Sequence, residues 1–105
     1  MPDSKYQLRY LPKYEDDLNE IIDYIVLDLK NPVSANSLVD KIELAIFERL
    51  HFPLSFEPYQ SVKKRKHPYY RIYVDNFTIF YVVIGDMMEV RRILYSRRDM
   101  TQQIK

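Results

Sequence analysis

The chain has no cysteine, no tryptophan and only one glycine among its 105 residues. Without cysteine it has no disulfides, no thiolate catalysis and no cysteine-based metal site, and its composition fits a reducing cytoplasm. A single glycine with six prolines argues against a turn-rich sandwich or barrel. No apolar run approaches the ~20 residues of a membrane span, and residues 1–5 lack the apolar core of a signal peptide. We therefore expect a cytoplasmic protein without membrane association.

Common catalytic motifs are also missing. The sequence has no glycine-rich phosphate loop, no His-Glu zinc helix and no serine nucleophile motif. The two histidines, His51 and His67, lie in different parts of the chain, and no carboxylates are placed to complete a metal site with either. We expect no metal and no cofactor.

Apolar residues make up 47% of the chain, which is enough for a real hydrophobic core. The length fits one domain over residues 1–105. The net charge of +1 conceals a strong asymmetry. Residues 1–57 carry 11 acids and 6 lysines or arginines, whereas residues 58–105 carry 4 acids and 10. This pattern indicates either a polyanion-facing surface on the second half or separate solvated faces on each element.

The first 50 residues predict a short strand and two helices. Residues 6–11 alternate apolar and polar side chains, as a half-buried strand does, and Pro12 ends them. Apolar residues at helical spacing then predict a helix over residues 14–29, with acids crowding its first turns. Asn31-Pro32 stops this helix and caps a second one that runs to Leu50. So short a link requires an antiparallel hairpin, whose apolar stripes need a third surface to cover them.

Residues 51–68 contain three prolines and predict a loop. Three strands follow, over residues 69–74, 77–84 and 87–95, with tight turns at Asp75-Asn76 and Gly85-Asp86. The middle strand is apolar at nearly every position and should be central. The expected fold is α+β: an N-terminal strand, an antiparallel helical hairpin, a three-stranded antiparallel meander and a short C-terminal tail. One sheet face packs on the hairpin, and the other is left open for function.

Cations cluster in two places. The loop carries a basic run that is a candidate for phosphate contact, with neighbouring tyrosines to stack on bases; its alternative role is a solvated loop. The residues of this run are Lys63, Lys64, Arg65, Lys66 and His67. A second cluster surrounds Tyr95 and should gather at one end of the sheet, which favours a negative partner. It consists of Arg71, Arg91, Arg92, Arg97 and Arg98.

Adjacent residues of a strand point to opposite faces, so Arg91 and Arg92 should do the same. We expect one of them to approach the helices and pair with a carboxylate of the hairpin. The most plausible proton-transfer groups near these cations are Tyr95 and His67.

Three segments stand in the order and spacing of a known family: Asp17-Leu18-Asn19-Glu20-Ile21-Ile22-Asp23-Tyr24-Ile25, Asp75-Asn76-Phe77-Thr78-Ile79-Phe80-Tyr81, and Val90-Arg91-Arg92-Ile93-Leu94-Tyr95-Ser96-Arg97-Arg98-Asp99. With them the chain resembles, over essentially its whole length, the RelE/ParE superfamily of toxins from bacterial type II toxin–antitoxin operons. The resemblance implies a growth-arresting toxin and a cognate antitoxin that wraps it.

The resemblance implies one of two targets, ribosome-bound mRNA or DNA gyrase. One branch of the superfamily cuts mRNA in the ribosomal A site without a metal, and the other poisons gyrase. The mRNA-cutting pattern matches here at Arg71 and Arg97. Tyr95 or His67 would have to substitute for its acid/base residue, and neither matches the pattern. The pattern is broken at Thr78, where that branch has an arginine, and at Gln103, where it has a tail tyrosine. The long hairpin is similar to the gyrase-directed branch, and the basic loop to the ribosome-directed one.

The sequence thus names Arg71, Tyr95 and Arg97 as candidate catalytic residues, should the protein be an mRNA-cleaving enzyme. The basic run Lys63 to His67, together with Arg98, is the candidate nucleic-acid contact. A non-toxic basic module that docks an operon partner or nucleic acid is the alternative from another class. Growth arrest on induction, relieved by a neighbouring gene product, would exclude that alternative.

Overall fold

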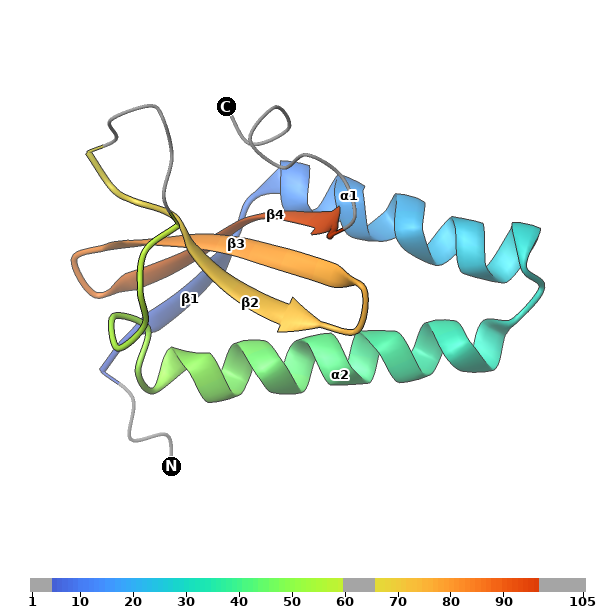
Figure 1. Cartoon of the computed structure of the whole chain (residues 1–105), viewed down its shortest axis with the longest axis horizontal. Helices are drawn as coiled ribbons and strands as arrows, with labels where there is room; N and C mark the ends of the chain where they lie inside the picture. Colours follow the sequence, from blue (N-terminus) through green and yellow to red (C-terminus); the bar gives the residue numbers. More distant parts are fainter. Residues whose placement is uncertain (1–4, 60–65, 97–105) are drawn as a thin grey trace.

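The computed structural model describes residues 5–59 and 66–96, which form a four-stranded sheet and a helical hairpin (Figure 1). The strand order is β1-β4-β3-β2, with β2, β3 and β4 in an antiparallel meander and β1 parallel to β4. The α+β fold class is confirmed. The elements in chain order are β1 (Gln7–Tyr10), α1 (Pro12–Asp23), η1 (Tyr24–Asp28), α2 (Pro32–Leu50), β2 (Tyr70–Val74), β3 (Phe77–Ile84) and β4 (Met87–Tyr95).

The turns of the meander follow from local chemistry. Both β3 and β4 have their expected bounds, and β2 begins one residue later than expected, at Tyr70. Asp75 and Gly85 adopt positive φ angles, 52° and 61°, as two-residue hairpin turns require. The only glycine of the chain therefore stands where the backbone needs it.

The hairpin link also forms as expected, but the first helix differs. The Asn31 side chain caps α2 by accepting a hydrogen bond from the Ser34 N–H at 3.1 Å. The expected single helix over residues 14–29 is an α-helix to Asp23 followed by the π-helix η1. A π turn holds more residues than an α turn and so rotates the apolar stripe. The hairpin tip also extends past the sheet (Figure 1), and Leu27 is 66% exposed there.

The main core lies between the hairpin and one face of the sheet. In Figure 1, α1 runs beside the end of β4 and α2 runs beneath β2, and contacts join both pairs. The sheet therefore supplies the third surface that the two helical stripes require. The buried members of this core are Tyr14, Leu38, Ile42, Ile46, Tyr70, Ile72, Val74, Ile79, Tyr81, Met88, Val90 and Ile93.

The opposite face carries a smaller apolar cluster of Tyr69, Phe80, Val82 and Leu94. Tyr59 packs its ring edge-on against Phe80, with the ring centroids 5.5 Å apart. The face expected to be open is therefore partly covered by the end of the loop. Below, "open face" means this side of the sheet. None of the helices in the described part of the chain is long and apolar enough to cross a membrane.

Candidate functional site

The strand register brings cations from three strands to the open face. Phe80 and Val82 lie two residues apart on β3 and so share this face. Arg71 of β2 lies directly opposite Phe80, and Glu89 of β4 lies opposite Val82. Arg9 of β1 in turn lies opposite Glu89. Because directly opposed residues share a face, one carboxylate stands between arginines of separate strands.

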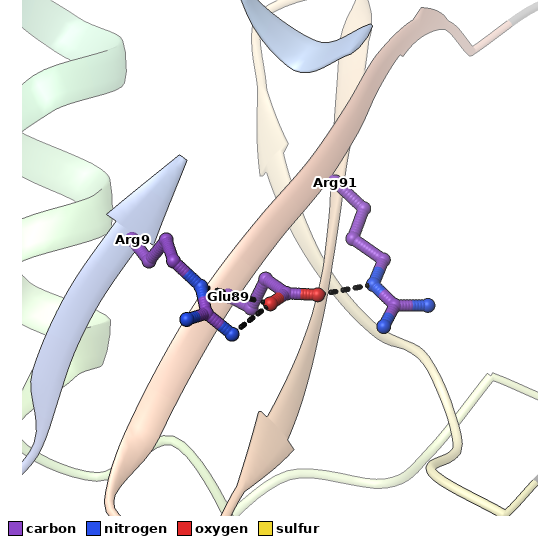
Figure 2. A network of polar contacts seen from close by, with 3 residues as sticks. All are labelled: Arg9, Glu89 and Arg91. Carbon is purple, nitrogen blue, oxygen red and sulfur yellow. Dashed lines mark hydrogen bonds and ion pairs between the residues drawn. The ribbon is translucent and has the colours of Figure 1, made fainter. Parts of the chain in front are cut away.

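Glu89 is the central anion of this face (Figure 2). Its side chain is only 5% exposed and accepts hydrogen bonds from Arg9 Nε at 3.0 Å and from Arg91 Nε at 2.7 Å. Arg9 Nη2 donates to it as well. Burial raises the pKa of Glu89, but hydrogen bonds from Arg9 and Arg91 and their charges outweigh that effect and hold the pKa below its ordinary value. Glu89 is therefore an anion that fixes two arginines in place.

A β-bulge interrupts the pairing of β4 with β3 at Arg91 and Arg92. Phe80 pairs with Arg92 and Tyr81 pairs with Val90, so Arg91 is the extra residue of the bulge. Strict alternation does not hold at a bulge, so the contacts decide where the two side chains go: Arg91 reaches Glu89 on the open face, whereas Arg92 reaches Asp17 of α1.

The expected pairing with the hairpin is confirmed for Arg92. Its Nε donates to Asp17 Oδ2 at 2.7 Å and its Nη2 donates to Asp17 Oδ1 at 3.1 Å. The same carboxylate accepts the Ile93 backbone N–H at 3.2 Å, on a side chain that is only 9% exposed. Asp17 therefore fastens α1 to β4 through both a charge pair and a backbone group.

Arg71 has a different environment. Its guanidinium carbon lies 4.9 Å from the centroid of the Tyr59 ring and 5.8 Å from that of Tyr73. Its backbone carbonyl accepts a hydrogen bond from Arg49 Nη1 at 2.8 Å, so α2 holds the edge strand at this residue. Aromatic faces attract the cation without occupying its N–H edges.

Tyr95 does not join Arg71. It lies opposite Phe77, and their ring centroids are 5.7 Å apart. Phe77 is three residues from Phe80 on β3, so it faces the hairpin side, and Tyr95 faces that side with it. The structure therefore puts two of the three candidate catalytic residues on opposite faces of the sheet.

The position that interrupts the mRNA-cutting pattern is closed to solvent. Thr78 is fully buried, and its hydroxyl lies 2.7 Å from that of Ser96. An arginine at this position would have to displace that contact and come out of the core.

Several candidate residues fall outside the described part of the chain, namely Lys63, Lys64, Arg65, Arg97 and Arg98, as does Gln103. Their roles stay predictions. Of the same run, Lys66 is exposed and His67 is half-buried. Within residues 5–59 and 66–96 no group of three or more histidines and carboxylates is placed to hold a metal ion.

A separate groove opens on the hairpin side, between α1, η1 and the end of β4. Its volume is about 690 Å³, and its lining is mainly apolar, with Ile21, Ile25 and Phe77 among its walls. Tyr95 and Leu29 also line it. Leu29, at the hairpin tip, is 56% exposed.

Sequence reasoning missed Arg9, Glu89 and Asp17. Glu89 is an acidic residue in a strand that is otherwise apolar and basic. Such a position weakly indicates that the acid is buried between cations. The Arg9–Glu89 contact depends on the parallel pairing of β1 with β4, and the Asp17–Arg92 contact depends on the packing of α1 against β4. No local sequence pattern predicts either arrangement.

Comparison with known proteins identifies the family. The family model for the ParE toxin of the type II toxin–antitoxin system, parDE, matches residues 8–100. The structure resembles a chain of the chromosomal ParDE system from P. aeruginosa, with a TM-score of 0.68 and 19% identity over 87% of this chain and 96% of that one. It also resembles a chain of the RelB–RelE antitoxin–toxin complex from Methanococcus jannaschii, with a TM-score of 0.57 and 21% identity over 92% of this chain and 99% of that one. A search of curated proteins found no match.

The two similar structures support the fold alone, whereas the family model identifies the family. Its match extends from the first strand, through the hairpin and the meander, to residue 100. The chain therefore belongs to the ParE toxin family of type II toxin–antitoxin systems.

Proposed function

We propose that this toxin arrests growth by poisoning DNA gyrase, and that it does not cut mRNA. The observation that carries the proposal is the separation of Arg71 from Tyr95. Ribonucleolytic attack needs a cation at the scissile phosphate and a proton-transfer group within hydrogen-bond reach of the same atoms. Here Arg71 pairs across from Phe80 and Tyr95 across from Phe77, on opposite faces of the sheet. The buried Thr78, in place of an arginine, adds to this argument.

The direct test is an in vitro supercoiling assay with purified gyrase, alongside a translation extract in which mRNA ends are mapped. We expect loss of supercoiling and accumulation of cleaved gyrase–DNA complexes, with transcripts intact at the same toxin concentration. Cut transcripts together with normal supercoiling would refute the proposal.

A Tyr95→Phe variant separates the two mechanisms inside cells. If Tyr95 transferred a proton, removing its hydroxyl would lower the cleavage rate by about 10²–10⁴-fold and abolish growth arrest. We expect growth arrest to persist, because the ring contact with Phe77 remains. Loss of toxicity in a variant that keeps its melting temperature would favour the enzyme.

A cognate antitoxin completes the proposed system. The apolar groove and the hairpin tip offer it a surface, since Leu27, Leu29 and Val33 are 66%, 56% and 73% exposed. Such uncovered apolar side chains on a small domain mark an interaction site.

Co-expression with the product of the neighbouring gene should relieve growth arrest. A Leu29→Asp variant should stay toxic and escape that relief, and its neutralisation at the wild-type level would place the antitoxin elsewhere.

A further inference from the structure

We infer that the open face binds a single strand of DNA along a band of arginine and tyrosine side chains. The inference rests on the proposed function in one respect, because it takes gyrase-bound DNA as the source of the strand. The band crosses the sheet from β2 to β1. Its members are Tyr73, Arg71, Tyr59, Tyr69, Arg91, Glu89 and Arg9.

The first half of the band combines a cation with aromatic platforms. Tyr73 and Arg71 lie two residues apart on β2 and therefore share the open face, about 6.6 Å apart along the strand. Tyr73 is 61% exposed, so its ring is accessible to a stacking base. The Tyr59 ring centroid lies 4.9 Å from the same guanidinium carbon. Rings beside a cation suit unpaired bases, which stack on the rings while a phosphate contacts the cation.

Arg71 is also held in advance of binding. Arg49 fixes its carbonyl, and the Tyr59 and Tyr73 rings lie 4.9 Å and 5.8 Å from its guanidinium carbon. Within residues 5–59 and 66–96 the observed side-chain partners of Arg71 are aromatic rings and not carboxylates. Ring contacts of this kind leave the N–H donors of the guanidinium for a phosphate.

Arg91 connects the second half of the band to the first, because its guanidinium carbon lies 5.9 Å from the Tyr69 ring centroid. The Glu89 carboxylate accepts hydrogen bonds from Nε and Nη2 of Arg9 but only from Nε of Arg91. A guanidinium has five N–H donors, so both arginines keep donors for a phosphate. Two cations against one anion leave this group at +1, and Arg9 remains 51% exposed. Glu89 therefore holds the two arginines in position without neutralising the net positive charge of the group.

The combination of rings and cations favours a nucleic acid over an acidic peptide. An acidic peptide would be held by the arginines alone and would leave the exposed Tyr73 without a role. Unpaired bases use both kinds of side chain. A duplex hides its bases from such rings, so a single strand is the better fit.

The test measures fluorescence anisotropy of a short labelled deoxyoligonucleotide with the full-length toxin, over a range of salt concentrations. We expect salt-dependent binding that weakens about tenfold in Arg71→Gln and in Tyr73→Ala. Lys13→Gln removes one charge from α1, and Tyr24→Ala removes one exposed ring from η1. These matched controls lie away from the open face and should bind as the wild type does. Circular dichroism melts confirm that all four variants fold.

Equal affinities for the variants and their controls would overturn the inference. So would tighter binding of duplex DNA or of RNA with the same base sequence, or stronger displacement by polyglutamate than by unlabelled oligonucleotide. Gyrase inhibition, assayed in parallel, reports on the proposed function separately. Wild-type toxin that binds the strand and leaves gyrase active would refute that function alone. Wild-type toxin that poisons gyrase and binds no strand would refute this inference alone.

Discussion

Replacing Glu89 by glutamine should destabilise the domain by about 2 kcal/mol at neutral pH. The variant keeps the shape of the side chain and removes the charge that holds Arg9 and Arg91. The carboxylate accepts three hydrogen bonds from these two arginines. Hydrogen bonds to charged groups contribute ~1.5–3 kcal/mol each when they are buried. Here the arginine side chains are 51% and 31% exposed, so water replaces part of what is lost and the sum is much smaller.

The destabilisation caused by Glu89→Gln should depend on pH, and the pKa shift of Glu89 gives the direction of that dependence. The folded-state pKa of Glu89 lies below its ordinary value, so the group binds its proton less readily in the folded than in the unfolded chain. Its stabilisation is then fully present above the unfolded pKa of about 4.3 and is lost as the pH falls through the folded value. The difference in unfolding free energy between wild type and Glu89→Gln should therefore shrink as the pH drops below about 4.

Thermal unfolding followed by circular dichroism measures both effects. A loss of ~2 kcal/mol corresponds to a melting temperature lower by about 8–16 °C in a domain of this size. Glu57→Gln, at an exposed acid outside the cluster, is the matched control and should melt within about 2 °C of wild type. Equal destabilisation by Glu89→Gln at pH 3 and pH 7 would refute the electrostatic reasoning, because packing loss does not depend on protonation.

Three further changes probe other parts of the fold. Asp17→Asn should lower the free energy of unfolding by about 2–3 kcal/mol in urea, because Arg92 loses its charge partner in a largely buried position; an unchanged midpoint would show that the pair contributes nothing. Gly85→Ala should cost ~1–2 kcal/mol through its φ of 61° alone, since the added Cβ meets open space, and Gly85→Asn should cost less in the same melts. Tyr81→Phe should cost about 1–2 kcal/mol, because Pro53 O loses its donor at 2.7 Å and Arg49 Nη1 loses one of its two acceptors, at 3.0 Å; a gain in stability would contradict this account.

The sequence was sufficient for the elements that local chemistry controls. The apolar run over residues 77–84 predicted a central strand, and it is central and largely buried. Asn31-Pro32 predicted a capped helix start, and the cap forms. Helical periodicity did not reveal η1, because a π turn changes the spacing by one residue within a stripe that is still apolar.

The candidate site was predictable only in part. Arg71 and the Arg92–hairpin pair follow from composition and spacing. The separation of Tyr95 from Arg71 does not, because it depends on which residue of β3 lies opposite each of them. Strand pairing through tight turns predicts that the two residues are near each other, but not that they share a face, because a shift of one residue in register reverses the face of a side chain.

On its own, then, the sequence determined the order of elements, their turns and the basic character of the second half, since each depends on residues close together in the chain. Tertiary structure alone decided that β1 lies parallel to β4 and that Arg9 therefore joins Arg91 on the Glu89 carboxylate. Those outcomes depend on pairing between segments some 80 residues apart, as the Arg9–Glu89 contact shows. The physical reason is that periodicity is a local property of the chain, whereas register and burial arise only when distant strands meet.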